Sequence, residues 1–174
     1  MAVRDVIVIP HETLITKAPK VKKFDQELHT LIDDMVDTMR AAPGVGLAAP
    51  QVDVRQRVIV VEYGDDEDEE VTPELYTLVN PVVSRRSRDT VLGIEGCLSI
   101  PDFVCEVERS LEATVKAQDR NGKPIKIKAK GWLARIFQHE VDHLDGILML
   151  DRAERIFKLE DIEEMLQEEV TGFD

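Results

Sequence analysis

The stretch Gln138-His139-Glu140-Val141-Asp142-His143 places a glutamate directly after the first of two histidines that are four positions apart. If this stretch is helical, His139 and His143 lie one turn apart on the same face and can bind one metal ion. Glu140 then stands beside a ligand without being one, close enough to handle the proton of a water on the metal. The ordinary alternative is a pair of surface or hydrogen-bonded core histidines, because the motif alone is only moderately specific.

The residues around this stretch favour a helix. Apolar side chains recur there at mostly three- and four-residue steps, and Gly146 is a suitable stop. They are Trp132, Leu133, Ile136, Phe137, Val141 and Leu144. A catalytic site of this type needs three protein ligands and one open position, so the chain must supply a third ligand elsewhere.

Cysteine is the first candidate for that ligand. The chain has two cysteines, Cys97 and Cys105, which are too few for a disulfide framework in a domain of this size. One of them is better interpreted as a thiolate ligand. Cys97 lies in a glycine-containing stretch, Gly93–Ser99, upstream of the histidines.

The composition indicates a globular protein. The chain has 174 residues, of which 43% are hydrophobic and 33% are charged, and it contains no apolar run near the length of a membrane span. We expect one domain over residues 1–174, with an irregular arm at 1–23 and an acidic helix and tail at 155–174. Residues 1–10 hold only a short apolar cluster in place of a signal peptide, so we expect a cytoplasmic location and no membrane contact.

The charge is strongly acidic. The formal net charge is -13, which argues against a general nucleic-acid binder, since such proteins usually show a basic patch. Residues 65–70 form an unbroken acidic run, and residues 160–169 are acidic as well. Both segments are interpreted as solvated surface. No sequence-specific nucleic-acid binding is expected.

Helical patterns flank the middle of the chain. Residues 24–42 show apolar side chains at helical spacing and are followed by Pro43 and Gly44, so a helix is predicted to end near Ala42. Residues 155–169 repeat such a pattern and predict a second amphipathic helix. Its apolar positions are Ile156, Leu159, Ile162 and Leu166.

Strand patterns dominate the middle. Residues 57–63 predict a strand, and residues 76–83 predict another, at an edge or with an end near Pro81. Residues 111–118 and 125–130 alternate apolar and polar side chains around Asn121-Gly122, which is a strong hairpin signal. We therefore predict an α+β fold, in which mostly antiparallel sheet packs around the metal-binding helix.

The stretch Gly44–Gln51 reads GVGLAAPQ. Two glycines separated by one residue let a backbone approach something closely. The stretch lacks the third glycine of a dinucleotide-binding turn and the Gly-Lys-Ser/Thr of a phosphate loop. A tight helix-to-strand connection is the equally good structural interpretation of this stretch alone.

Three stretches, taken together and in order, resemble the peptide deformylase family. They are GVGLAAPQ at 44–51, EGCLS at 95–99 and HEVDH at 139–143, and the resemblance runs from about Val6 to about Asp151. It implies removal of the formyl group from the N-terminal formylmethionine of nascent polypeptides, with release of formate.

The resemblance also implies roles for particular residues. Cys97, His139 and His143 would hold one divalent metal, with a water in the fourth position that attacks the formyl carbonyl. Glu140 would take the proton of that water and deliver a proton to the departing amine.

Further residues carry roles through the same resemblance. The side-chain amide of Gln51 and the backbone N–H of Leu98 would stabilise the oxyanion. An extended substrate would pair along Gly44, Val45 and Gly46. Glu95 and Arg109 would form a pair behind the ligands.

The metal follows from the ligand set and the resemblance. One thiolate and two imidazoles suit zinc, iron, cobalt or nickel. The resemblance implies Fe(II) as the physiological metal, with zinc, nickel or cobalt in purified protein. Parts of the family contact the ribosome through a basic tail, but the acidic C-terminal helix here does not suit such a contact.

Two alternatives differ in class. A His-Glu-x-x-His metallopeptidase usually recruits a third ligand C-terminal to the motif, whereas this chain offers a thiol upstream. A structural zinc site could combine Cys97, Cys105, His139 and His143, but it would have no use for Glu140 or Gln51. The remaining histidines, His11 and His29, lie outside any motif and are expected at the surface.

Overall fold

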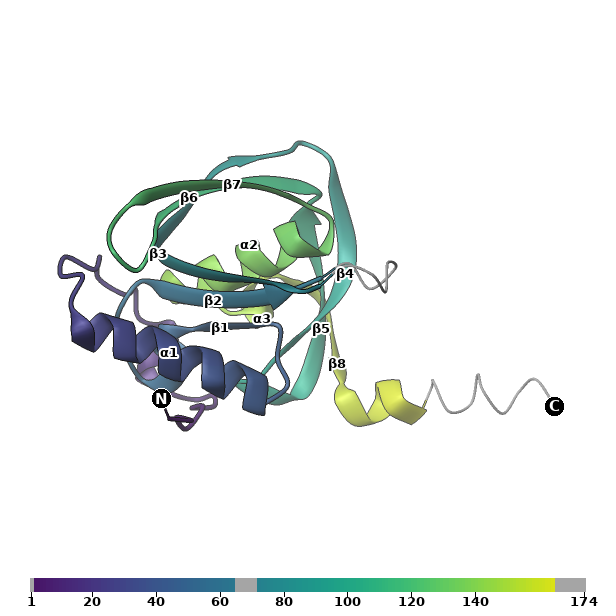
Figure 1. Cartoon of the computed structure of the whole chain (residues 1–174). Helices are drawn as coiled ribbons and strands as arrows, with labels where there is room; N and C mark the ends of the chain where they lie inside the picture. Colours follow the sequence, from purple (N-terminus) through teal and green to yellow (C-terminus); the bar gives the residue numbers. More distant parts are fainter. Residues whose placement is uncertain (1, 65–71, 165–174) are drawn as a thin grey trace.

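Two antiparallel sheets surround one central helix in the computed structural model, which describes residues 2–64 and 72–164 (Figure 1). The first sheet has the strand order β1-β2-β3-β6-β7, and the second has the order β4-β5-β8. The strands are β1 Gly46–Ala48, β2 Val58–Tyr63, β3 Glu74–Arg86, β4 Thr90–Cys97, β5 Ile100–Ser110, β6 Glu112–Gln118, β7 Pro124–Lys130 and β8 Ala153–Lys158. The helices are η1 Glu12–Ile15, α1 Gln26–Ala41, η2 Ala49–Val52, α2 Trp132–Leu144 and α3 Met149–Arg152. The predicted α+β class with mostly antiparallel sheet is confirmed.

Helix α2 is the element on which both sheets converge. Its apolar side packs on the inner face of the five-stranded sheet, where small β6 residues such as Ala113 and Ala117 leave room for it. Phe137 is fully buried there, and its ring meets the edge of Tyr76 with the centroids 5.3 Å apart. The predicted helix and its end before Gly146 are confirmed. Because so much of α2 is buried, its polar side chains must find partners inside the protein.

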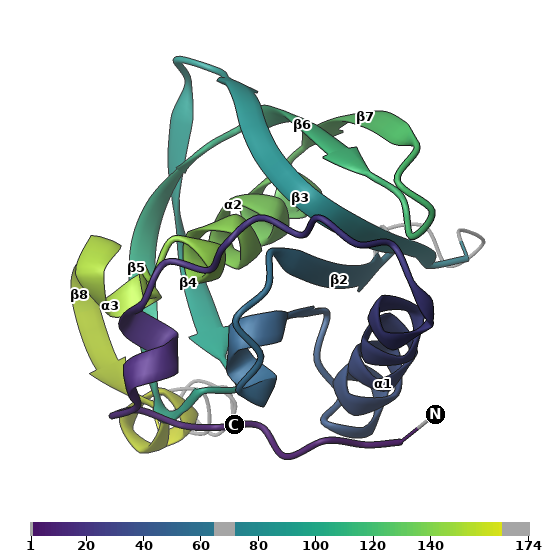
Figure 2. The ribbon, with the colours of Figure 1, turned by 90° about the vertical axis from the view of Figure 1, so that its left-hand side faces the viewer.

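Helix α1 covers the other end of the five-stranded sheet, next to β1 and β2 (Figure 2). It begins at Asp25, whose side chain accepts a hydrogen bond from the Leu28 N–H, and it ends before Pro43 as predicted. Its buried residues join the β1 and β2 side chains in one core. Residues 2–23 form an extended arm in which the one helical turn described is η1.

The predicted hairpin is confirmed, with β6 and β7 paired from Glu112↔Lys130 to Gln118↔Pro124. The prediction that Pro81 marks an edge or a strand end is wrong, because β3 runs through Pro81 to Arg86 and lies between β2 and β6. Pairing with β2 ends at Val79, and pairing with β6 shifts register between Val79 and Val82. Proline is accommodated inside the sheet since it falls at this bulge, where no ladder hydrogen bond is required of it.

The predicted helix at 155–169 is wrong at its start. Residues 153–158 form strand β8, which pairs with β5 from Val107↔Ala153 to Phe103↔Lys158, and the helix begins only at 159. The pairing satisfies the backbone hydrogen-bonding groups on the second side of β5. The helical pattern alone gives little stabilisation in return, since its apolar residue Ile156 remains 52% exposed. The part of the prediction at 165–169, like the acidic run at 65–70, lies outside the described residues.

The two histidines outside the motif are not free surface residues. His11 and His29 are half-buried and bonded rather than free at the surface, since His11 Nδ1 accepts from the Thr13 N–H and His29 Nε2 lies 2.8 Å from the Arg120 carbonyl oxygen. Within the described residues, no helix has the length and apolar character needed to cross a membrane.

Candidate metal centre

Three side chains from two elements converge at the middle of α2. Cys97 stands at the end of β4, at a shift in register between Gly96 and Cys97, and it faces His139 and His143 of the helix. One ligand atom from each of the three lies within 4.8 Å of the others, and Cys97 Sγ is 3.4 Å from His143 Nε2. The structure thus brings together the three residues proposed as ligands. Cys105 does not belong to this group of ligand atoms. It is buried in the core beneath the second sheet, against which Cys97 also packs.

The chemistry of the donor set fits a divalent cation. A thiolate with two imidazoles is a common ligand set for zinc and neighbouring transition metals. Burial lowers the pKa of His143 well below its usual range, which keeps its ring neutral as a ligand must be. Burial also disfavours the charged form of His139, but the Cys97 thiol and the Glu95 carboxylate outweigh burial and raise its pKa to about 10. The surroundings of His139 therefore favour positive charge, and a divalent cation on the neutral ring would supply that charge in place of a second ring proton.

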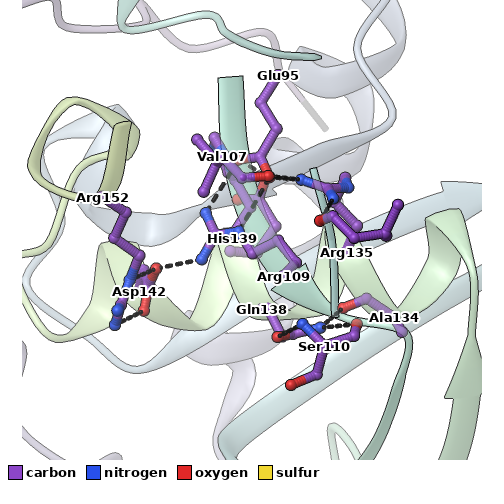
Figure 3. Close-up of polar contacts among 12 residues, drawn as sticks. Glu95, Val107, Arg109, Ser110, Ala134, Arg135, Gln138, His139, Asp142 and Arg152 are labelled. Atoms are coloured by element: carbon purple, nitrogen blue, oxygen red, sulfur yellow. Dashed lines mark hydrogen bonds and ion pairs between the residues drawn. The ribbon is translucent and has the colours of Figure 1, made fainter. Parts of the chain in front are cut away.

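Glu95 fixes the orientation of His139 (Figure 3). Glu95 Oε1 accepts from His139 Nδ1 at 2.9 Å. The other ring nitrogen, Nε2, is left for the group that contains the Cys97 thiol. Burial opposes the charge on Glu95, but hydrogen bonds from His139 and Arg109 outweigh burial and hold its pKa well below the usual range. The side chain is therefore a carboxylate, and His139 donates to it.

Two arginines surround the same carboxylate. Arg109 donates to both oxygens of Glu95 at 2.9 Å, and Arg135 Nη1 donates to Oε2 at 2.6 Å. Arg109 also donates to Asp142 at 2.6 Å, and Asp142 in turn pairs with Arg152 near the surface. All these side chains except Arg152 are at least nine-tenths buried. In the buried part of the network, the positive charges of Arg109 and Arg135 neutralise the negative charges of Glu95 and Asp142 behind the ligands.

Sequence reasoning missed Arg135, Asp142 and Gln138. Arg135 also donates to the Val107 and Val91 carbonyl oxygens, and Gln138 bonds the backbone of Ser110 on β5. Their position on the helix could have indicated them. Charged or amide side chains on a helix that is expected to be buried must have hydrogen-bond partners inside the protein.

Glu140 points into the site with one oxygen free. Its Oε1 lies 4.0 Å from His139 Nε2, and its buried Oε2 has no hydrogen-bond partner among the described residues. Burial raises the pKa of Glu140 to about 7. Gly46 makes this position possible, because a Cβ at residue 46 would come within 2.7 Å of Glu140 Oε1.

The side-chain amide of Gln51 is fixed by hydrogen bonds, and its nitrogen lies beside the Cys97 thiol. Its Oε1 accepts from the Ala48 N–H at 2.9 Å, while Nε2 donates to Ser99 Oγ at 3.1 Å and lies 3.6 Å from Cys97 Sγ. The side chain is 1% exposed. A neutral donor is therefore fixed beside the thiol.

A cleft of about 670 Å³ opens over these groups. Strand β1 with the preceding Gly44 and Val45 forms one wall, and Leu98 lies across from it, with its Cδ1 only 3.1 Å from the place of a Cβ on residue 44. Apolar side chains complete the lining, and they are Ile94, Ile100, Phe103, Val104, Trp132, Ile136 and Leu159. Nine of the eleven residues proposed from the sequence for the site line this cleft, and the other two, His143 and Arg109, lie directly behind it and contact Cys97 and Glu95.

The site has a buried carboxyl group beside one cysteine thiol and two imidazoles of α2, at the floor of an apolar cleft. This arrangement defines the class of mononuclear metallohydrolases. The family model described as polypeptide deformylase matches residues 3–158, and the chain belongs to this family.

Named relatives and solved structures agree. The peptide deformylase of Thermomicrobium roseum is 46% identical over 99% of both chains, and peptide deformylase 1 of Bacillus subtilis is 43% identical over 95% of this chain and 99% of that one. The crystal structure of the Thermotoga maritima peptide deformylase superposes with a TM-score of 0.82 at 36% identity, covering 89% of this chain and all of that one. A peptide deformylase from Ehrlichia chaffeensis in complex with actinonin gives the same TM-score and identity over 99% and 98% of the two chains.

The family membership decides the reaction class. The chain is a metal-dependent enzyme that removes the N-terminal formyl group from polypeptides. The deformylase interpretation is thereby favoured over a metallopeptidase and over a structural zinc domain.

Proposed function

We propose that Cys97, His139 and His143 hold one divalent metal in the deformylation of formylmethionyl nascent peptides, with Glu140 as the proton-handling residue. The observation that carries this assignment is the buried Glu140 carboxyl, with a free oxygen and a pKa of about 7, next to the three ligand atoms. When bound, the metal supplies Lewis-acid catalysis and lowers the pKa of a coordinated water.

Glu140 acts first as a base and then as an acid. Its carboxylate accepts a proton from the water that attacks the formyl carbon, and the carbon–nitrogen bond of the formamide then breaks. The same proton passes to the leaving amine, so that formic acid and a free N-terminal amine result and Glu140 returns to its starting state. The formic acid then loses its remaining proton and leaves as formate. A pKa of about 7 suits a group that must accept a proton in one step and donate it in the next at neutral pH.

Gln51 and Leu98 stabilise the oxygen of the formyl group as it becomes negative. The Gln51 amide is already turned toward the thiol by its bonds to Ala48 and Ser99, so no reorganisation is needed during the reaction. The backbone N–H of Leu98 follows the ligand Cys97 directly and is held near the centre by it.

The substrate pairs along the free edge of β1. This strand is the last in the order of its sheet, so one side of Gly44, Val45 and Gly46 is available to an extended peptide. The apolar lining beyond it suits the flexible, polarisable side chain of methionine.

The proposal also covers the identity of the metal and the cellular location of the enzyme. The ligand set accepts iron, zinc, nickel or cobalt, and the family resemblance favours Fe(II) in the cell. We propose a cytoplasmic enzyme with a single domain over residues 1–174. We propose that it contacts the ribosome transiently, through a surface other than the acidic C-terminal segment. The Glu95–Arg109 pair positions His139 from behind.

The deciding experiment measures formate release from a formyl-methionyl peptide by protein purified without oxygen, with metal analysis of the same sample. Glu140→Ala is the comparison. Formate release by the wild type alone, at equal metal content, supports the proposal. Absence of formate release despite one bound metal per chain would contradict it.

A further inference from the structure

The outer face of strands β3, β6 and β7 carries a concentration of basic side chains on an acidic protein. We call it the basic face and define it as Arg85, Lys116, Lys126, Lys128 and Lys130 on the outer side of the strands, with Arg86 and Arg88 at its rim. Arg86 is the last residue of β3 and stands opposite the inward-facing Ala113, and Arg88 lies just after the strand. All seven residues are exposed, and they contribute seven of the 22 lysines and arginines in the chain. The inward positions of the same strands, such as Val115 and Ala129, are apolar and pack toward α2.

The strand register brings these charges together. Lys116 stands directly opposite Lys126, and Thr114 lies between Arg85 and Lys128. Alternate residues of one strand share a face about 7 Å apart, so Lys126, Lys128 and Lys130 form a row along β7. Like charges directly opposite each other in a sheet are unfavourable. The basic face therefore keeps a repulsion that a bound polyanion would relieve.

The described part of the protein supplies little neutralisation. No ion pair joins any of the seven side chains to another described residue, although exposed acids are abundant elsewhere on the molecule. Glu112, opposite Lys130, is the one acidic side chain that lines the hollow on this face.

The shape of the basic face suits a chain of phosphates. Arg85, Arg86, Arg88, Lys128 and Lys130 line a hollow of about 810 Å³. Ala113 and Ala129, which belong to the inner side of the strands, line it as well, so the hollow lies at the end of the sheet and is not confined to its outer side. A hollow with arginines on one side and lysines on the other fits an extended polyanion better than a flat bilayer surface. Arginine forks bind phosphate oxygens in pairs, and lysines attract them as point charges.

We propose that the basic face binds the phosphate backbone of RNA without regard to sequence. The face lies on the side of the sheet away from α2, while the catalytic cleft lies on the α2 side, as the positions of β6 and β7 over α2 in Figure 1 illustrate. RNA on the basic face thus leaves the cleft open to a peptide. The net charge of -13 describes the whole chain and does not reveal the basic face. The seven positive charges of the face are outweighed by negative charges elsewhere in the chain.

The test is fluorescence anisotropy of a labelled oligouridine and of an RNA of mixed sequence, titrated with the metal-loaded protein at several salt concentrations. The test variant is Lys126→Gln/Lys128→Gln/Lys130→Gln. The control is Lys17→Gln/Arg55→Gln/Lys158→Gln, which removes three exposed cations outside the basic face and has the same net charge. Formate release from a small peptide shows that both variants are folded.

We expect both RNAs to bind the wild type and the control equally, and the test variant to bind about tenfold more weakly with a salt slope lower by about two. Equal binding by all three proteins, or no binding by the wild type at low salt, would overturn the proposal. Capture by anionic phosphatidylserine vesicles that needs the same lysines, without RNA binding, would overturn it as well.

Discussion

Glu95 on β4 and His139 on α2 meet in a 2.9 Å hydrogen bond although they are 44 positions apart in the chain. The bond assigns the proton of His139 to Nδ1 and leaves Nε2 free for a metal. A carboxylate behind a ligand imidazole also makes the ring a better donor to the metal. Glu95 can take this role because Arg109 and Arg135 keep it ionised in a buried place.

Replacing Glu95 by glutamine should weaken metal binding by about 10- to 100-fold. Glutamine keeps the size but loses the charge, and its amide N–H groups cannot accept from Arg109 or Arg135. The affinity is measured by competition with a fluorescent chelator. The control is Glu154→Gln on β8, an exposed position without an ion pair in the described structure. An affinity equal to the wild type would contradict the positioning role of Glu95.

Replacing Gln51 by glutamate should lower kcat by about 100- to 1,000-fold. A carboxylate can still accept from the Ala48 N–H, so the local fold is kept, but it offers no donor to the developing oxyanion. Steady-state kinetics are measured on samples with known metal content. Full kcat in Gln51→Glu with one metal per chain would exclude the side-chain amide from oxyanion stabilisation.

The ligands could be found from the sequence because helical spacing is a local property. His139 and His143 are one turn apart on any helix, and the EGCLS stretch around Cys97 carried the family resemblance. The charge network behind them could not be found in this way. Arg135 reaches a carboxylate 40 positions earlier, across a Gly93 that leaves space for its guanidinium, and only the folded topology shows this contact.

The errors in the fold have a common physical cause. Residues 153–158 have a helical pattern, yet they form a strand because β5 offers a row of unpaired backbone groups. Strands β4 and β5 were not predicted. Gly93 and Gly96 interrupt the alternation that marks a strand in β4, and Pro101 stands at the start of β5. In both places long-range pairing outweighs the local preference.

Asp34 predicts a pH dependence of stability. Burial raises the pKa of Asp34, but the hydrogen bond from the Ala2 N–H and the contacts with Arg4 outweigh burial and lower it below 3.8. A lowered pKa stabilises the folded state above pH 3.8, and this contribution is lost as the pH falls through the folded-state pKa. The side chain fastens the N-terminal arm to α1.

The corresponding variant is Asp34→Asn. At pH 7 it should lower the free energy of unfolding by about 1–2 kcal/mol, since it removes charge-assisted hydrogen bonds. The difference from the wild type should shrink below about pH 4, as followed by urea unfolding across the pH range. Asp102→Asn, at an exposed position of β5, is the control and should stay within about 0.5 kcal/mol. A difference that does not change with pH would mean that the charge of Asp34 has no role.

Gly46→Ala tests the position of Glu140 without changing any titratable group. The new Cβ would lie 2.7 Å from Glu140 Oε1 and 3.0 Å from Cδ, so the carboxyl must move away from its place beside His139. Proton transfer depends steeply on such placement, and we expect kcat to fall by about 100-fold. Metal content should remain at the wild-type level, because the carboxyl of Glu140 is not among the three ligand groups. Loss of activity together with loss of metal would instead indicate that α2 itself had shifted, and unchanged kcat would show that Glu140 works from a position other than the one beside Gly46.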